Sequence, residues 1–337
     1  GDVYKRQAPL LEIRNVKKYY PVKKVRNGED ISVKAVDQID LTVNQGEIVG
    51  LVGESGCGKS TLGKTILKLH DITGGQILFH GEDITNYTEK QMRPLREKIQ
   101  IIFQDPYASL NPKKKVVQSV MTPLDVSGKY TKEEKLKKVI DILNEVGLSE
   151  KFLEKYPHEM SGGQRQRVVI ARALINDPEL VICDEPVSAL DVSVRSQVLN
   201  LLKDLQKERN LTYIFISHDL SVVEYLCDRV AVMYLGKIVE LGTAEQIYEH
   251  YLHPYTEVLL KSAPNLDPRT RTEKPMIEGN PPSPIDILPG CRFCKRCKDA
   301  EGLCFEVEPE FKEIEPGHFC ACHKSVSYTH LTLPTKL

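Results

Sequence analysis

The sequence predicts an α/β protein with a mainly parallel sheet, followed by a smaller cysteine-rich module. Three observations predict this fold class. Apolar runs alternate with helix-type periodicity from residue 10 to about residue 262. Several of these runs are short and apolar throughout, which is typical of central parallel strands buried on both faces. Six of the nine cysteines fall within residues 291–322.

Composition narrows the function classes. The 337 residues suit one large domain and a smaller one, and 41% hydrophobic with 28% charged residues is typical of a folded globular protein. A formal net charge of −1 argues against a dedicated nucleic-acid binder. No apolar stretch reaches the roughly 20 residues of a membrane span, and no secretory signal is visible, so we expect a cytosolic chain. Clustered cysteines then indicate a metal before disulfides.

The strands are predicted in chain order. Residues 11–16 and 31–43 alternate between polar and apolar, which predicts antiparallel strands near the start. Residues 47–52 form an apolar run that ends in a glycine-rich loop, residues 180–183 end in two acids, and residues 212–217 end in a histidine. Because the carboxyl ends of parallel strands share one edge of a sheet, we expect these side chains to gather there.

The remaining segments complete the predicted organisation. Residues 132–155 have helix-type apolar spacing and predict amphipathic helices, with apolar positions at Leu136, Ile140, Leu143 and Val146. The predicted organisation is an adapter-derived tail (1–7), the α/β domain (8–262) with a helical subdomain at about 105–175, a proline-rich connector (263–290), a cysteine-rich module (291–325) and a second adapter-derived tail (326–337).

A phosphate-binding loop is predicted at residues 53–60, called the phosphate loop below. Its sequence fits G-x-x-x-x-G-K-[ST] and lies between an apolar run and a helical pattern. Glycines allow backbone N–H groups to surround a phosphate, Lys59 can reach the β- and γ-phosphate oxygens, and the Ser60 hydroxyl can ligate Mg²⁺. We therefore expect a nucleoside triphosphate as the ligand.

Two further strand ends carry residues suited to hydrolysis. Asp184 and Glu185 are adjacent acids, of which Asp184 would hold Mg²⁺ and Glu185 would act as the general base on the attacking water. His218 follows the next strand and can hydrogen-bond the γ-phosphate. The alternatives are an N-capping acid pair and a structural histidine, and the phosphate loop favours the catalytic interpretation of the acids.

Residues 160–164, MSGGQ, predict a second anion site. Ser161 can cap the following helix, and the free N–H groups at the start of that helix attract an anion. At this point residues 10–262 resemble the ATP-binding cassette family. The matching positions are Tyr20 for the adenine-stacking aromatic, Gly53, Ser55, Gly56, Cys57, Gly58, Lys59, Ser60 and Thr61 for the Walker A loop, Gln104 for the Q-loop, Ser161, Gly162, Gly163 and Gln164 for the signature, Asp184 and Glu185 for Walker B, Asp191 for the D-loop, and His218 for the switch histidine. Met160 departs from the family's usual leucine, and we expect this swap to be mild.

The resemblance implies a mechanism. Two cassettes would pack head to tail, with ATP between the phosphate loop of one and the signature of the other, where Asp191 also belongs. Mg²⁺ would be held through Ser60, Gln104 and Asp184. Glu185, His218 and Gln104 would form the catalytic set, and hydrolysis would reverse the ATP-driven closure.

Residues 52–63 and 103–112 also resemble the F-type ATPase subunits of bacterial oligopeptide and dipeptide importers. That resemblance implies a D-type cassette partner, two membrane permease subunits, an external peptide-binding protein, no nucleic acid, and a peripheral place on the cytoplasmic face of the bacterial inner membrane. Two alternatives are a non-transport cassette ATPase acting on nucleic acid or ribosomes, and a metal-sensing module that uses nucleotide only to assemble. The near-zero charge argues against the first, and the presence of Glu185 argues against the second.

The cysteine-rich module matches the C-terminal extension of the same subfamily. Its matching positions are Cys291, Cys297, Cys304 and Cys322, which in some members bind a [4Fe–4S] cluster. Four thiolates also suit structural zinc, and the spacing does not decide between the two. Cys294 and Cys320 replace residues that are usually not cysteine, so the ligand set stays open, as do free thiols.

Overall fold

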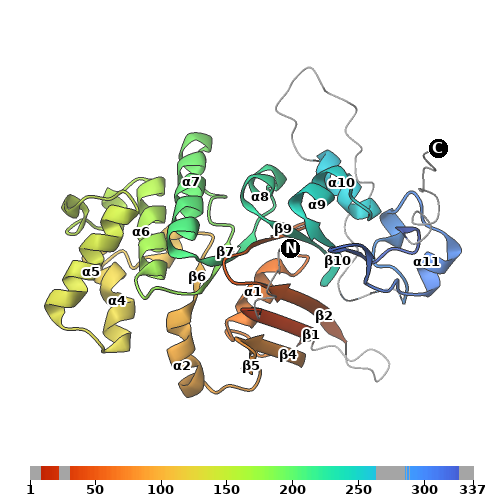
Figure 1. The fold of residues 1–337 in the computed structure, drawn as a ribbon, viewed down its shortest axis with the longest axis horizontal. Helices are drawn as coiled ribbons and strands as arrows, with labels where there is room; N and C mark the ends of the chain where they lie inside the picture. The colour runs from red at the N-terminus through yellow and green to blue at the C-terminus, as the bar shows by residue number, and fades with distance from the viewer. Residues whose placement is uncertain (1–8, 23–30, 263–284, 286, 288, 326–337) are drawn as a thin grey trace, which may run out of the picture. The chain divides into compact units, whose positions relative to one another are not determined.

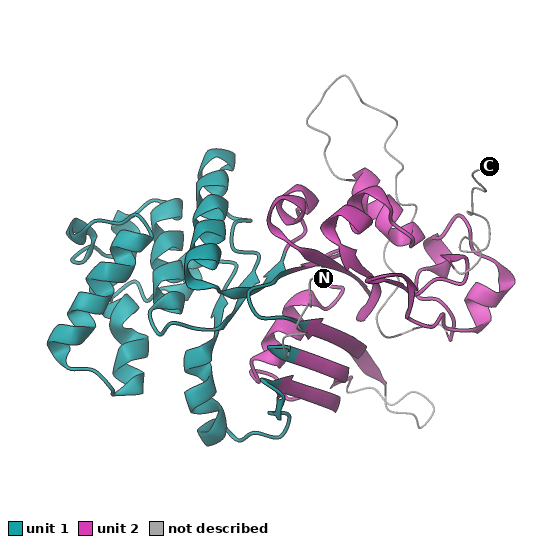
Figure 2. Ribbon diagram, viewed as in Figure 1, with its two compact units in different colours: residues 1–11, 43–48, 79–216 teal, residues 12–42, 49–78, 217–337 magenta. Residues whose placement is uncertain are grey.

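The computed structural model describes residues 9–22, 31–262, 285, 287 and 289–325. The two predicted adapter-derived tails and most of the predicted connector lie outside these residues. The chain divides into two compact units, shown in Figure 2: unit 1 is residues 1–11, 43–48 and 79–216, and unit 2 is residues 12–42, 49–78 and 217–337. Each unit is described by itself, and each element is placed in the unit that holds most of its residues.

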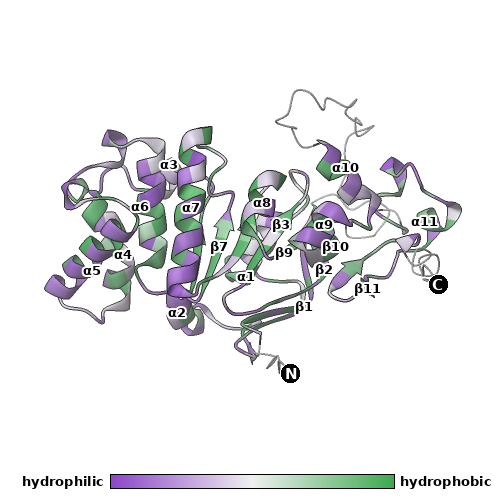
Figure 3. Cartoon of the chain, turned by 45° about the horizontal axis from the view of Figure 1, so that its top comes forward, coloured by the Kyte–Doolittle hydropathy of each residue, from purple (hydrophilic) through white to green (hydrophobic). Residues whose placement is uncertain are grey.

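Unit 1 contains three parallel strands in the order β8-β7-β6. They are β6 (Ile99–Ile102), β7 (Leu180–Asp184) and β8 (Thr212–Ile216). Every residue of β7 and β8 is buried, as the unbroken apolar runs predicted, and Figure 3 shows β7 in green. The parallel register pairs Ile102 with Cys183, so the chains leave β6 and β7 at the same edge.

The helices of unit 1 pack on this sheet or on one another (Figure 1). They are α2 (Glu89–Lys98), α3 (Pro106–Ser109), α4 (Val116–Ser127), α5 (Lys132–Glu145), α6 (Gly162–Leu174) and α7 (Val192–Arg209), together with the 3₁₀ turns η1 (Glu150–Phe152) and η2 (Pro157–Glu159) and the short strand β5 (Glu82–Asp83). The predicted helical insertion is therefore present.

The four apolar positions predicted within that insertion differ in burial. Residues 132–155 form one α-helix followed by a 3₁₀ turn, and the buried face of α5 includes Val139, Ile142 and Leu143. Of the predicted positions, Leu143 and Val146 are buried, Ile140 is half-buried and Leu136 is 42% exposed.

Unit 2 contains parts of two sheets. The strands β1 (Leu11–Pro21), β2 (Ser32–Val43) and β4 (Gly74–Phe79) lie in the order β2-β1-β4. The second set has the order β11-β12-β10-β9-β3. Its strands are β3 (Ile48–Val52), β9 (Arg229–Tyr234), β10 (Lys237–Thr243), β11 (Lys312–Glu315) and β12 (His318–Cys320). β3 and β9 are parallel and the other pairs are antiparallel, so the cysteine-rich module adds strands to the edge of the core sheet.

The helices of unit 2 are short. They are α1 (Lys59–Ile66), α8 (Leu220–Leu226), α9 (Ala244–Glu249), α10 (Pro254–Ser262), the 3₁₀ turn η4 (Cys294–Arg296) and α11 (Gly302–Glu306). Across the described ranges of the whole chain, no helix combines the length and the apolar character needed to span a bilayer.

Candidate functional site

The phosphate loop connects β3 to α1 in unit 2, as predicted. Gly53 has φ +149° and Gly58 has φ +110°. A Cβ atom would lie 2.2 Å from the Met233 carbonyl oxygen at Gly53 and 2.0 Å from the Ala35 carbonyl oxygen at Gly58. Backbone packed this closely leaves no room for a side chain, so both glycines are required by the structure.

Lys59 begins α1 and is buried. Its Nζ donates to the Gly53 carbonyl oxygen at 2.7 Å and to the Glu54 carbonyl oxygen at 3.0 Å. The ammonium group is therefore held inside the loop, next to the N-terminus of a helix, where an anion is favoured. Cys57 is also buried, and burial raises the pKa of its thiol, so this cysteine is an unreactive packing residue.

Two other predicted residues lie in unit 2. The exposed His218 follows Ser217, whose backbone N–H donates to the Leu51 carbonyl oxygen at 3.2 Å. This bond holds the residue before His218 against the strand that leads into the phosphate loop. Tyr20 lies near the end of β1, with the Lys18 Nζ 4.9 Å from its ring centroid.

In unit 1 the structure brings Gln104 and Glu185 together. Ile102 and Cys183 are the last residues paired between the parallel strands β6 and β7. Gln104 and Glu185 each lie two positions beyond that residue pair. The Gln104 Nε2 donates to the Glu185 Oε2 at 2.8 Å. The amide thus orients the carboxylate, and its oxygen is left as the group suited to a metal ion.

The backbone at Glu185 is in the left-handed region, with φ 48°. It is held there by a hydrogen bond from its N–H to the Ile216 carbonyl oxygen at 3.0 Å, and its own carbonyl accepts from the Ser188 hydroxyl at 3.1 Å. Such a conformation is unfavourable for a residue other than glycine and persists only where its surroundings fix it. The preceding Asp184 is buried at the end of β7.

The signature segment forms the N-terminus of α6. The Ser161 hydroxyl accepts from the Gln164 N–H at 3.3 Å, and the Gln164 side chain accepts from the Ser161 N–H at 3.0 Å. This reciprocal capping box confirms that Ser161 caps the helix. A Cβ atom on Gly163 would lie 2.3 Å from the Val194 Cγ1, so glycine is needed where α6 packs on α7. Asp191 is the N-cap residue of α7.

The cysteine-rich module, residues 291–325, was predicted to hold a metal centre. Its cysteines converge on one cavity of about 20 Å³, lined by Cys291, Cys294, Cys297, Cys304 and Cys322. Cys294 therefore belongs with the four predicted ligands, whereas Cys320 is buried in β12 and does not line this cavity. Burial raises the pKa of Cys291 to about 12 and also raises that of Cys297, so both are neutral thiols at pH 7.

The donor chemistry fits a thiolate-ligated group, but the arrangement is not a ready site for a single ion. Among the residues that the structure describes, no three or more His, Cys, Asp and Glu side chains are grouped so that they could hold a metal ion. This finding supports neither the zinc nor the [4Fe–4S] alternative.

Sequence reasoning missed the residues that hold Glu54 in the phosphate loop. The Arg296 guanidinium donates to both carboxylate oxygens of Glu54, at 2.9 and 2.8 Å, and the Glu54 N–H donates to the Tyr255 hydroxyl at 2.9 Å. These partners are about 200 and 242 residues away in sequence. Their only signal in the sequence was an acidic residue inside a loop that binds an anion.

Comparisons with known proteins agree with this geometry. Residues 36–188 match the family described as ABC transporter, and residues 239–304 match the oligopeptide/dipeptide transporter, C-terminal region. The chain is 50% identical over 321 residues to the oligopeptide transport ATP-binding protein AppF of Bacillus subtilis, covering 94% of this chain and 98% of that protein. It is 48% identical over 316 residues to the dipeptide transport ATP-binding protein DppF of Escherichia coli, covering 94% of each.

Solved structures give the same result for the fold. CbiO1 of Clostridium perfringens, part of the ABC transporter complex cbiONQ, superposes with a TM-score of 0.63 at 31% identity, covering 72% of this chain and 92% of that chain. The ATP-binding cassette MJ0796, solved as a dimer in a post-hydrolysis state with ADP and Pi, gives a TM-score of 0.61 at 30% identity, covering 69% and 98%. The chain belongs to the ABC transporter family, in its branch of oligopeptide and dipeptide transport ATPases.

Proposed function

We propose that this chain binds and hydrolyses ATP to drive a bacterial importer of oligopeptides or dipeptides, with the residue roles given by the motif set. The observation that carries the proposal is the hydrogen bond from Gln104 to Glu185 at the ends of two paired parallel strands. It holds a carboxylate in one orientation, as a general base on water requires. The phosphate loop and its buried Lys59 support the binding half of the proposal.

In this proposal, binding of the triphosphate and attack by water are carried out by different residues. The phosphate loop binds the triphosphate through its backbone N–H groups and Lys59, and His218 contacts the γ-phosphate. Glu185 takes a proton from the attacking water while Gln104 keeps its carboxylate oriented. Mg²⁺ would be held by oxygens of Ser60, Gln104 and Asp184, and when bound it would neutralise charge on the phosphates.

The signature is proposed to act on a second cassette. Ser161 to Gln164 form the N-terminus of α6, with Ser161 exposed, and this end is suited to the γ-phosphate of ATP bound on a partner. Asp191 would lie in the same interface, and Tyr20 would stack on adenine. The dimeric state of MJ0796 with ADP and Pi supports a dimer of two cassettes. We further propose a D-type cassette partner, two permease subunits, an external peptide-binding protein, and a peripheral position on the cytoplasmic face of the membrane.

The experiment that tests this function is Glu185→Gln in the assembled transporter. We expect ATP turnover to fall by roughly 10²–10⁴-fold, because the general base is lost, while ATP stays bound in a trapped dimer. Glu179→Gln is the matched control, since Glu179 precedes the same strand and pairs with Lys98 at its opposite end. Turnover near that of the wild type in Glu185→Gln would remove Glu185 from the role of base.

The cysteine cavity is proposed to hold a [4Fe–4S] cluster through Cys291, Cys297, Cys304 and Cys322, with Cys294 as a fifth available thiol. The convergence of five thiols on one cavity supports this proposal. The test is anaerobic purification with an absorption spectrum and iron, sulfide and zinc quantification, on the wild type, Cys297→Ser and the control Cys320→Ala. About four irons per chain, lost only in Cys297→Ser, is the expected result. One zinc, or no metal, would overturn it.

A further inference from the structure

Glu54, the second residue of the phosphate loop, is fixed through each of its polar groups. Its N–H donates to the Tyr255 hydroxyl at 2.9 Å, and its carbonyl oxygen accepts from the Lys59 Nζ at 3.0 Å. Its carboxylate accepts two hydrogen bonds from Arg296, at 2.9 and 2.8 Å. A bidentate ion pair of this kind fixes direction as well as distance, so it constrains the loop at this residue.

Arg296 reaches Glu54 from the cysteine-rich module, where it ends the turn η4 and directly precedes Cys297. The side chains of Arg296 and Glu54 are 5% and 20% exposed, so the pair is largely withdrawn from water. The guanidinium also donates to the Tyr234 hydroxyl at 3.1 Å. Its hydrogen bonds to Glu54 are the first cause of a raised pKa at Arg296, and a guanidinium is a cation at pH 7 in any case.

An aromatic cluster surrounds this ion pair. The rings of Tyr234 and Tyr255 have centroids 4.6 Å apart, and Phe293 lies 5.3 Å from both. The Arg296 guanidinium lies 5.7 Å from the Tyr234 ring centroid and 5.9 Å from that of Phe293. Cation–π contacts and the packed rings leave the guanidinium little freedom to leave Glu54.

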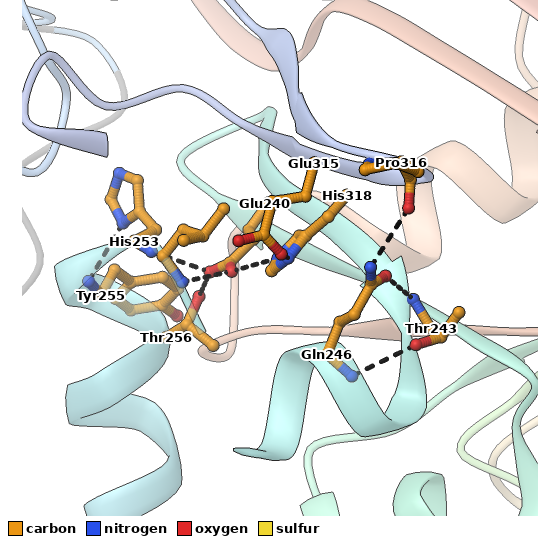
Figure 4. Close-up of polar contacts among 10 residues, drawn as sticks. Glu240, Thr243, Gln246, His253, Tyr255, Thr256, Glu315, Pro316 and His318 are labelled. Carbon is orange, nitrogen blue, oxygen red and sulfur yellow. Dashed lines mark hydrogen bonds and ion pairs between the residues drawn. The ribbon is translucent and has the colours of Figure 1, made fainter. Parts of the chain in front are cut away.

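The cysteine-rich module is itself attached firmly to the rest of unit 2. Figure 4 shows the buried Glu240 of β10, which accepts hydrogen bonds from the Leu252 N–H at 2.6 Å, the His253 N–H at 3.0 Å, the Thr256 hydroxyl, and the His318 Nε2 at 2.8 Å. His318 belongs to β12, so this carboxylate joins the module to β10 and to the start of α10.

A second attachment lies nearer the module's start. The buried Arg292 pairs with Asp37 and donates to the Leu235 carbonyl oxygen. With β12 paired to β10, the module is joined to the core at several points, and the position of Arg296 is set by them.

The charge of Glu54 matters because of where it lies. A carboxylate beside the triphosphate repels it, and the repulsion grows as water is excluded. With Arg296 in place the pair carries no net charge, and the loop presents its N–H groups and Lys59 to the phosphates without that penalty. Removing Arg296 alone would leave a partly buried acid beside the nucleotide.

We propose that Arg296 of the cysteine-rich module is a positioning residue of the phosphate loop, which neutralises and orients Glu54 and thereby sets the affinity of the loop for adenine nucleotide. The inference rests on the proposed function, because it assumes that this loop is where ATP binds. It assigns a role in nucleotide binding to a module that the ATPase motifs do not include.

The test is calorimetric titration of the full-length chain with ADP, together with steady-state ATPase kinetics of the assembled transporter. Arg296→Gln is expected to raise the Kd for ADP and the KM for ATP roughly five- to tenfold, in the usual range of coupling between sites, with kcat changed less than about twofold. The double variant Glu54→Gln/Arg296→Gln is expected to return to within about twofold of the wild type, because the uncompensated charge is gone. Arg296→Lys keeps the charge and is expected to lie between the wild type and Arg296→Gln.

Lys298→Gln is the matched control. Lys298 lies two residues further along the same module, pairs with Glu257 at 3.3 Å, and has a side chain that is 67% exposed. Circular dichroism of each variant checks that it folds, and Arg296→Lys supplies the comparison if Arg296→Gln does not. An unchanged Kd in Arg296→Gln, or an equal rise in the single and double variants, would overturn the inference. Lys59→Ala with unchanged ADP affinity would instead contradict the assignment of the loop, and so separates the two failures.

Discussion

The two units hold their nucleotide-directed residues in different ways. In unit 1, Gln104 and Glu185 meet because their strands are paired, and Ser161 is held by a residue three positions along the chain. In unit 2, the phosphate loop is held by Tyr255 and Arg296 from distant parts of the chain. Strand register and a helix cap therefore set the reactive groups of unit 1, whereas side chains from outside the loop set the binding loop of unit 2. We expect changes in unit 1 to act mainly on turnover and changes in unit 2 mainly on binding.

The largest effect is expected from Lys59→Ala, which tests whether unit 2 determines the affinity for ATP. The Kd for ATP should rise by roughly 100-fold, because charge-assisted hydrogen bonds to the phosphates are lost. The measurement is calorimetric titration, and Lys64→Ala on the same helix α1 is the matched control. Retained affinity for ATP in Lys59→Ala would contradict the expectation that changes in unit 2 act mainly on binding.

The second effect concerns pH and the stability of unit 2. Burial lowers the pKa of His253 to about 4, and its Nδ1 accepts a hydrogen bond from the Tyr255 N–H at 3.0 Å, so the folded state holds it neutral. In the unfolded chain a histidine takes up a proton near pH 6.5. Between about pH 6.5 and 4 the unfolded chain therefore binds one more proton at this histidine than the folded chain does. As a result, the free energy of unfolding falls by roughly 2 kcal/mol from pH 7 to pH 5.

Urea titrations followed by circular dichroism measure this dependence, since the chain has no tryptophan. His253→Gln should make the free energy of unfolding less dependent on pH in that window, whereas His250→Gln, at the exposed end of α9, should leave the dependence as it is. An unaltered slope in His253→Gln would contradict this source of the pH dependence.

The third effect is steric and lies in unit 1. Gly163→Ala should lower the free energy of unfolding by about 1.5 kcal/mol, because the new methyl group would lie 2.3 Å from the stiff Val194 side chain. Gly162→Ala is the matched control, since its methyl group would meet Leu190 at an ordinary 3.5 Å. Urea midpoints compare the two. If adding Val194→Ala does not restore the free energy of unfolding of Gly163→Ala, the contact with Val194 is not the cause of the lost stability.

The smallest effect is expected at Gln104. Gln104→Ala should lower kcat about fivefold, because the base stays in place but loses its orienting hydrogen bond, and the Kd for ATP should change less than about twofold, because Ser60 and Asp184 remain to hold Mg²⁺. Single-turnover hydrolysis and nucleotide titration separate the two quantities. Gln100→Ala on β6 is the control, since its side chain donates to the Arg96 backbone. A rise in Kd without a change in turnover would place Gln104 with the binding residues.

The sequence predicted those parts of the molecule that depend on neighbours in the chain. The buried strands β7 and β8, the start of α1 at Lys59 and the Ser161 cap all follow from short patterns, and the structure confirms them. The Gln104 and Glu185 pair was expected only as two motif residues, because the register that joins them is a property of the folded sheet.

The rest could not be predicted, because it depends on contacts between distant residues. Nothing in the spacing of Glu54 and Arg296 connects them, and the carboxylate of Glu240 looks like any acid in a strand. The five-thiol cavity shows the same limit, since the gaps between cysteines did not tell Cys294 from Cys320. The apolar spacing predicted the helix α5 but not the exposure of Leu136, because the packing of the helix decides which apolar side chains are covered.

The ion pair between Glu54 and Arg296 can form only late in the synthesis of the chain. The two residues are 242 positions apart, so a ribosome adding about 5–20 residues per second makes Arg296 roughly 12–48 s after Glu54. During that interval the loop sequence exists without its positively charged partner. A chain that stops before Arg296 therefore carries the whole motif with an uncompensated acid beside it, and on the inference above it would bind nucleotide less tightly than a chain that includes Arg296.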